Sequence, residues 1–219
     1  TQDFGIYIDA TSGGTNTIGG SGIGEGNVIS GNKDAGTTGR GIYINSSAAA
    51  GNTVLGNIIG PQADGTTYLA SNYQYRGVEI VNSANNIIGG NTAGARNTIS
   101  ANQSTGVYLS GAACSLNVVT GNYIGIDKNG TSFITGSTQD MGVYIFNFAA
   151  NNTIGGSGAG EGNVISGNYA NATDGWGINL NSSAAAGNTV LGNIIGPQAD
   201  GISYVVSGRK RVMRWLTTI

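Results

Sequence analysis

The 219-residue chain has no histidine, one cysteine, two prolines and few charged side chains. Without histidine, a Ser-His-Asp triad and every other histidine-based acid–base pair are excluded. Cys114 has no second cysteine to pair with, so an intramolecular disulfide and a multi-cysteine metal site are excluded as well. We therefore expect Cys114 to be a small buried or turn residue, and we expect no metal ion or cofactor.

Charge is scarce and unevenly distributed. Charged residues make up 9% of the chain, against roughly 25% in ordinary globular domains. Four of the nine basic residues lie in the last eleven positions, so the preceding part carries five basic and eleven acidic groups. A body with this balance offers no phosphate-binding surface, and nucleic acid is not an expected partner. The chain also lacks an apolar run of the roughly 18 to 20 residues that a membrane-spanning helix needs.

What the sequence does contain is an internal repeat. The segment Asn45–Gly65 recurs without change at Asn181–Gly201, and Asn16–Asn32 recurs with one change at Asn152–Asn168. Both pairs are separated by 136 residues, and a divergent copy lies between them at Asn86–Asn102. Self-similarity of this kind is the sequence signature of a repeat architecture.

A shorter unit lies inside the long repeat. It consists of a Gly-apolar-x-apolar tetrad, then Asn-x-apolar, then Asn-x-Ile or a close variant. The six tetrads, 29 to 36 residues apart, begin at Gly5, Gly41, Gly77, Gly106, Gly142 and Gly177. Apolar residues alternate with period two inside each unit, which indicates strands rather than helices. The chain is thus divided into six coils of three short strands.

Matched positions of the six coils carry similar β-branched or leucine side chains. The inward columns are Ile6, Ile42, Val78, Val107, Val143 and Ile178; Ile8, Ile44, Ile80, Leu109, Ile145 and Leu180; Ile18, Val54, Ile88, Val119, Ile154 and Val190; and Ile29, Ile59, Ile99, Ile124, Ile165 and Ile195. Such columns fill a narrow interior layer by layer, and one coil alone cannot bury its own apolar face. The pattern predicts an all-β fold, a right-handed parallel β-helix (solenoid) over residues 1–206.

Two columns of asparagine precede the second and third strands. They are Asn16, Asn52, Asn86, Asn117, Asn152 and Asn188, and Asn27, Asn57, Asn97, Asn122, Asn163 and Asn193. Asparagine tolerates a tight corner, and its amide can bond to the same amide one coil away. We expect two asparagine ladders along the solenoid.

The coils alternate in type. In the first, third and fifth coils a Gly-rich excursion joins the second and third strands, whereas the other three coils have a tight corner there. Each tight-cornered coil continues into a turn, such as Gly60–Gly65, and then a longer loop.

The patterns N-x-[IV]-x-G-N-x-I-G, N-[VT]-I-S-x-N and G-[IV]-Y-[IL] resemble the right-handed parallel β-helix repeats of large bacterial secreted and surface proteins. The resemblance covers about residues 4–206. It implies an extracellular or cell-surface location and an adhesin-like or structural role. Pectin-degrading enzymes share this architecture without sharing these repeats, and a fold does not fix a function.

An enzyme is the third-ranked interpretation. Glycoside hydrolysis needs two carboxylates facing one cleft, but Glu25 recurs as Glu161 and Asp64 recurs as Asp200, as repeated loop residues do. The best non-repeated acids are Asp127, Asp140 and Asp174, whose spacing does not join them. A lyase would need a basic residue, for which Arg40, Arg76 and Arg96 are the candidates, each more simply a solvated loop residue. Asp127–Gly130 resembles part of a Ca²⁺ loop but lacks the later acid, and we interpret it as a turn.

Two outward columns are the candidate binding surfaces. The tetrad's middle position carries tyrosine in four coils, at Tyr7, Tyr43, Tyr108 and Tyr144, which predicts a broken ladder on one face. The ladder is either an ordinary stack of strand residues or a platform for polysaccharide or a protein partner. The third strand's outward column is an apolar stripe of Val28, Ile58, Tyr123, Val164 and Ile194, interrupted by Thr98. Such a stripe should be covered by the long loops, which we favour, or by lateral packing of another chain.

Residues 207–219 leave the repeat and are basic. We interpret them either as a cap, with apolar residues on one side of a short helix, or as a truncated end. Strand edges at the ends of a solenoid also suggest head-to-tail stacking of copies into a fibre. The expected function is an extracellular structural or adhesive module without catalytic residues, and polysaccharide binding along the tyrosine column is the alternative.

Overall fold

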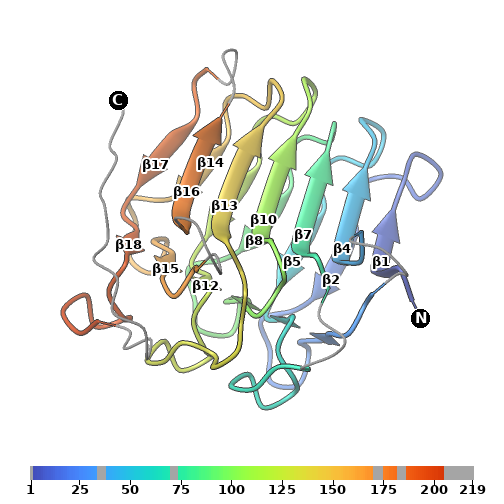
Figure 1. The fold of residues 1–219 in the computed structure, drawn as a ribbon. Helices are drawn as coiled ribbons and strands as arrows, with labels where there is room; N and C mark the ends of the chain where they lie inside the picture. Colours follow the sequence, from blue (N-terminus) through green and yellow to red (C-terminus); the bar gives the residue numbers. More distant parts are fainter. Residues whose placement is uncertain (1, 34–37, 70–73, 170–174, 182–185, 205–219) are drawn as a thin grey trace.

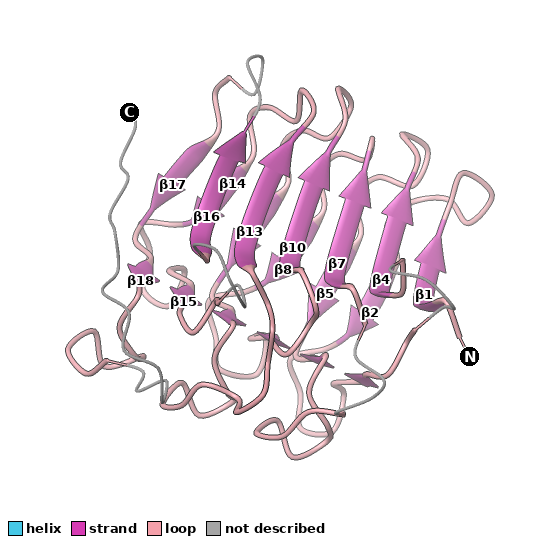
Figure 2. Cartoon of the chain, in the orientation of Figure 1, coloured by secondary structure: helices cyan, strands magenta, loops and turns pink. Residues whose placement is uncertain are grey.

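A computed structural model describes residues 2–33, 38–69, 74–169, 175–181 and 186–204. The described chain is all β and winds into a right-handed parallel β-helix, as the sequence predicted (Figure 1). Three parallel sheets of six strands each form its sides, and the arrows in Figure 2 follow one another coil by coil along the axis. A solenoid of this kind is stabilised mainly by contacts between neighbouring coils.

Each sheet takes one strand from every coil. The first sheet contains β1 (Phe4–Ile8), β4 (Arg40–Asn45), β7 (Arg76–Val81), β10 (Thr105–Ser110), β13 (Met141–Phe146) and β16 (Trp176–Asn181). The second contains β2 (Thr17–Gly19), β5 (Thr53–Leu55), β8 (Ile87–Gly89), β11 (Val118–Thr120), β14 (Thr153–Gly155) and β17 (Thr189–Leu191). The third contains β3 (Val28–Ile29), β6 (Ile58–Ile59), β9 (Thr98–Ile99), β12 (Tyr123–Ile124), β15 (Val164–Ile165) and β18 (Ile194–Ile195). We number the coils 1 to 6 from β1–β3 to β16–β18.

The strand register confirms the predicted core columns. Ile42 pairs with Ile6 and Val78, and Ile59 pairs with Ile29 and Ile99. Inward side chains of coils 2 to 5 are almost fully buried in one continuous cluster. Cys114 belongs to this cluster, as predicted, and its Sγ lies 3.7 Å from the Ile80 carbonyl oxygen.

Both asparagine ladders are present. In coils 1 to 5 each side-chain Nδ2 donates to the Oδ1 of the asparagine in the next coil, for example from Asn86 to Asn117 at 2.8 Å and from Asn97 to Asn122 at 2.9 Å. The backbone N–H of each asparagine donates to the same Oδ1, as at Asn86. Because a backbone N–H can only donate, the Oδ1 is fixed as the acceptor and each ladder runs in one direction.

A third amide ladder was not predicted. It lies between the third strand of each coil and the first strand of the next, and it alternates asparagine with glutamine. Its members are Asn32, Gln74, Asn102, Gln139 and Asn168, joined by bonds of 2.8 to 3.0 Å. Here too the side-chain nitrogens of the first four members donate toward the following coil. All three corners of the solenoid are therefore closed by amide ladders.

The alternation of coil types is also confirmed, because excursions of coils 1, 3 and 5 pack on one another across the tight corners. The Cα of Gly94 sits so close to Ser21 that an added Cβ would lie 2.1 Å from its carbonyl oxygen. Gly160 approaches the carbonyl oxygen of Asn91 equally closely. The tight corner between two excursions is fixed by a hydrogen bond from Gly56 N to Ala95 O at 3.1 Å.

The solenoid predicted for residues 1–206 is described as far as Tyr204. The segment 207–219, for which we expected a cap or a truncated end, lies outside the described residues.

Candidate functional site

Most acidic side chains of the described residues stabilise loops. Glu25 folds back to accept a hydrogen bond from Gly22 N at 2.7 Å, and its repeat copy Glu161 does the same with Gly158 N. Asp64 accepts from the backbone of Thr66 and Thr67, and these bonds lower its pKa to about 2. These recurring acids therefore close turns.

The non-repeated acids do not form a cluster. The Oδ1 of Asp127 accepts hydrogen bonds from Thr131 N and Ser132 N, which makes Asp127–Gly130 part of a turn, as expected. Asp140 is half-buried at the start of β13, and burial raises the pKa of its carboxyl. Asp174 lies outside the described residues. Among the described residues, no group of three or more His, Cys, Asp or Glu side chains could hold a metal ion.

The tyrosine column is open only near its beginning. Tyr7 is 45% exposed, Tyr43 and Tyr144 are half-buried, and Tyr108 is buried. The rings of Tyr7 and Tyr43 are stacked with centroids 5.3 Å apart and planes 15° apart. This spacing is close to the roughly 4.8 Å between strands, so the ring faces point along the solenoid axis. The Tyr7–Tyr43 pair therefore presents ring edges and hydroxyls sideways rather than a flat aromatic platform, whereas the rings of Tyr108 and Tyr144 meet at an interplanar angle of 63°.

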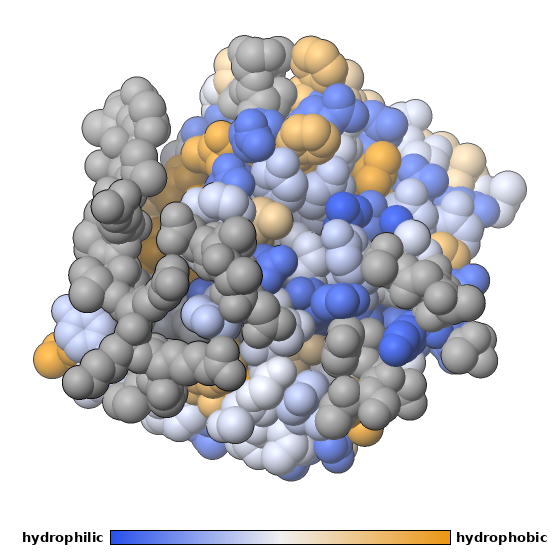
Figure 3. Space-filling view, in the orientation of Figure 1, coloured by the Kyte–Doolittle hydropathy of each residue, from blue (hydrophilic) through white to orange (hydrophobic). Residues whose placement is uncertain are grey.

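Between these tyrosines lies a charged cluster that the sequence analysis missed. Glu79 is 3% exposed and contacts both Arg40, at 2.5 Å, and Arg76, at 2.6 Å. The guanidinium of Arg76 also lies 3.7 Å from the centroid of the Tyr108 ring, which explains why that ring is covered. Figure 3 views the molecule from the side of the first sheet. Among the described residues visible there, hydrophilic side chains lie between apolar ones.

Our interpretation of Arg40 and Arg76 as solvated loop residues was wrong, whereas Arg96 lies in a loop, as expected, but is half-buried. Arg40 and Arg76 are strand residues whose side chains are only 17% and 19% exposed. Arg96 donates from Nε to Gly121 O at 3.1 Å and lies 4.2 Å from the Tyr123 ring centroid. All three arginines combine a hydrogen bond or ion pair with an aromatic contact, which favours a partly dehydrated position.

The apolar stripe on the third sheet is covered in its later part. Tyr123 and Val164 are buried and form a small cluster with Ile126, and the half-buried Ile194 and Ala199 pack against this cluster. Ile126 and Ala199 belong to the turns that follow β12 and β18, so these turns cover this part, while cover by the longer loops that follow the turns stays a prediction. At the other end of the stripe, Ile58 is half-buried and Val28 is 50% exposed.

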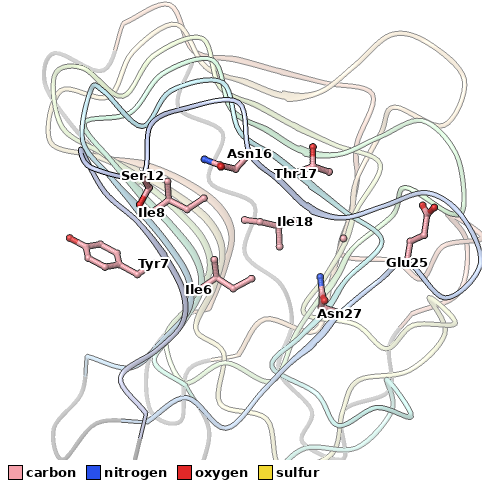
Figure 4. Close-up of a pocket in the computed structure, with 10 residues that line it drawn as sticks. Ile6, Tyr7, Ile8, Ser12, Asn16, Thr17, Ile18, Glu25 and Asn27 are labelled. Atoms are coloured by element: carbon pink, nitrogen blue, oxygen red, sulfur yellow. The ribbon is translucent and has the colours of Figure 1, made fainter.

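The first coil has a hollow of about 560 Å³ at its outer edge. Figure 4 shows Ile6, Ile8 and Ile18 pointing into the space that the coil encloses, with Asn16 and Asn27 at its corners. The Oδ1 atoms of these two asparagines accept no hydrogen bond from any described residue. The hollow is thus the cross-section of the core, lined by apolar side chains and ladder acceptors.

The last coil exposes the opposite cross-section. Leu180 is 49% exposed and Val190 is 40% exposed, whereas their repeat counterparts Ile44 and Val54 in coil 2 are completely buried. Trp176, at the start of β16, is also 43% exposed. Coil 6 repeats the inward columns of coil 2, but the described chain contains no coil that covers it.

The described residues include no helix that is long and apolar enough to cross a membrane. Comparison of the chain with protein-family models, with curated proteins and with solved structures found no match.

Proposed function

We propose that the chain is an extracellular structural or adhesive β-solenoid module. The proposal rests on the contacts that the polar side chains of the described residues make. Recurring acids close turns, amides form ladders, and arginines pair with Glu79 or with aromatic rings. Side chains that could take part in catalysis thus stabilise turns and contacts between coils instead. This is what we expect of a repeat protein that acts through its extended surface.

The resemblance of the repeats to those of bacterial surface proteins supports the same role. The low content of charged residues, at 9%, also suits a module that spaces or attaches rather than one that transforms a substrate.

Surface display tests this proposal. The chain is displayed on a non-adherent bacterium, and cell–cell cohesion and retention on protein- and polysaccharide-coated surfaces are measured. The control carries Ile80→Asp, which places a charge in the fully buried core and should unfold the solenoid. Cohesion or retention that requires the folded chain supports the proposal, and equal values for both displays overturn it. Release of reducing ends or unsaturated sugars from polysaccharides by the soluble chain would instead favour an enzyme.

Polysaccharide binding is the second candidate, and one observation favours it. Phe4, Tyr7 and Tyr43 form a mutually stacked group, and Arg40 lies 4.9 Å from the Tyr43 ring centroid. A sugar would contact the exposed Tyr7 edge and the basic group beside it. Tyr7→Ala should then reduce affinity in titration calorimetry against a polysaccharide panel, whereas Tyr204→Ala, at an exposed residue near the other end, should not. Equal affinities for the two variants would eliminate this surface.

A further inference from the structure

We propose that Arg40 and Arg76 form a binding site for the carboxylate groups of an acidic polysaccharide. The site lies on the first sheet across coils 2 to 4, so it does not depend on the first or the last coil. The inference rests on polysaccharide binding, the second candidate function above, and it names the class of polysaccharide as one that contains uronic acids. It concerns the charged cluster around Glu79, which contacts both arginines.

The two arginines occupy neighbouring positions of one column in the first sheet. Arg40 of β4 pairs with Arg76 of β7 in the parallel register, so their backbones lie about 4.8 Å apart. Like charges at opposite positions of two strands are destabilising. The other members of this column carry no charge and are Phe4, Thr105, Met141 and Trp176. The sheet therefore does not need a pair of arginines at this place, whereas an anionic ligand would give the pair a purpose.

Glu79 offsets only one of the two positive charges. One of its oxygens accepts from Arg40 Nε at 2.5 Å, and the other accepts from Arg76 Nη1 at 2.6 Å. Two guanidinium groups and one carboxylate leave one positive charge, on a part of the chain in which acids outnumber bases. The single negative charge of a uronate carboxylate balances this charge, whereas a phosphate monoester carries about 1.5 to 2 negative charges.

Both guanidinium groups retain hydrogen-bond donors that no described residue uses. Arg76 has five N–H groups, of which only those on Nη1 donate to a described residue, and its buried Nε has no partner. Arg40 donates from Nε to Glu79 and from Nη1 to Thr38 O, which leaves its Nη2. The Glu79 side chain is 4% exposed, whereas those of Arg40 and Arg76 are 17% and 19% exposed. A second carboxylate can therefore bridge the two guanidinium groups from their exposed side, as Glu79 does from the buried side.

Two tyrosines hold the guanidinium groups in place. Arg40 lies 4.9 Å from the ring centroid of Tyr43, and Arg76 lies 3.7 Å from that of Tyr108. The two rings flank Glu79 in the tyrosine column, two strand spacings or about 9.6 Å apart. Because the arginines are already ordered by these contacts, little conformational freedom is lost when a ligand binds. The half-buried Tyr43 also offers a ring edge and a hydroxyl to the neighbouring sugar.

Titration calorimetry with alginate, a polymer of uronic acids, tests the ligand class. Carboxyl-reduced alginate keeps the sugar chain without the charges, and polyglutamate presents carboxylates on a peptide. We expect alginate to bind at least about tenfold more tightly than either polymer, the equivalent of one charge-assisted hydrogen bond. Equal affinity for reduced alginate would overturn carboxylate recognition. Equal or tighter binding of polyglutamate would overturn the assignment to a polysaccharide.

Substitutions test the site itself. Arg76→Lys keeps the charge but loses the planar fork, and it should lower the affinity for alginate at least about fivefold. The matched control is Arg96→Lys, because Arg96 contacts Tyr123 on the side of the third sheet. The control should change the affinity less than about twofold, and equal losses for the two variants would contradict the assignment.

A double variant separates binding from folding. Arg76→Gln/Glu79→Gln removes the arginine without leaving a buried carboxylate that lacks this partner, so circular dichroism should show a folded chain. Its affinity for alginate should fall at least about tenfold, while its affinity for carboxyl-reduced alginate should not change. A folded double variant that binds alginate as tightly as the unmodified chain would show that the cluster only stabilises the sheet.

The outcomes separate this inference from the functions proposed above. A chain that binds alginate and its reduced form equally overturns the carboxylate site and leaves polysaccharide binding in place. A chain that binds no polysaccharide overturns both, and the adhesive role then depends on the display assay alone.

Discussion

At the scale of single residues, a ladder asparagine contributes more in the middle of the solenoid than at its end. Asn117 is fully buried and donates to Asn152 and to Ser83 O, while its Oδ1 accepts from both nitrogens of Asn86. Asn117→Ala should lower the free energy of unfolding by about 3 kcal/mol or more, since it leaves buried donors unsatisfied.

Asn16 occupies the same column in coil 1, where its Oδ1 accepts from no described residue. Asn16→Ala should cost only about 1 kcal/mol. Urea unfolding of the two variants measures the difference, and equal losses would show that the ladder does not depend on burial.

The second residue-scale prediction concerns Cys114. Burial raises the pKa of its thiol to about 12, whereas a thiol in the unfolded chain titrates near about 8.5. A raised folded-state pKa stabilises the fold fully below the unfolded value, and this contribution is lost as pH rises between the two values. Relative to Cys114→Ala, the chain should therefore lose about 2.5 kcal/mol of unfolding free energy between about pH 8 and pH 10.5. Parallel pH profiles of the two proteins in urea titrations would contradict this.

At the scale of elements, the two copies of one excursion differ in how much space they have. Gly24 and Gly160 have φ values of +82° and +78° in nearly identical sequences. Gly24→Ala in the monomer should cost only the left-handed backbone strain, about 1 to 2 kcal/mol. Gly160→Ala adds a clash 2.1 Å from the Asn91 carbonyl oxygen and should cost at least about 1 to 3 kcal/mol more. Thermal unfolding at low protein concentration compares the two, and a larger loss for Gly24→Ala would refute the packing of excursions described above.

The strands and two of the ladders could be predicted from the sequence because each depends on one residue type at a matched position. The isoleucine at the end of every Asn-x-Ile motif is such a position, and β9 and β12 place Ile99 and Ile124 in the same column. The third ladder could not be predicted in this way. It alternates asparagine with glutamine at irregular spacing in loops, so neither residue type nor period identifies it.

The charged cluster was missed for a different reason. In the sequence Glu79 only takes the place of a tyrosine in the tyrosine column. Its partners Arg40 and Arg76 lie outside the tetrads, directly before the glycines that begin them. Their burial depends on side chains from three strands, β4, β7 and β10, meeting on one face. A single-strand pattern contains no information on such a contact.

At the scale of the whole molecule, coil stability should fall from the middle toward both ends. Every residue of β10 is buried, whereas every residue of β16 is exposed or half-buried. In a solenoid each coil is stabilised by its two neighbours, so the end coils open most easily. Amide hydrogen exchange of dilute monomer should be slowest in coils 3 and 4 and fastest in coils 1 and 6. Uniform exchange along the chain would mean that the solenoid opens only as a single unit.

The common direction of the three amide ladders has an electrical consequence. Backbone dipoles in a sheet largely cancel, but each ladder amide that bonds to the next coil points its positive end toward coil 6. With about 3.5 D for each amide group, the dipoles add along the axis and give the solenoid a positive and a negative pole. The molecule should therefore orient in an applied field, and two solenoids lying side by side have their lowest dipolar energy when they point in opposite directions.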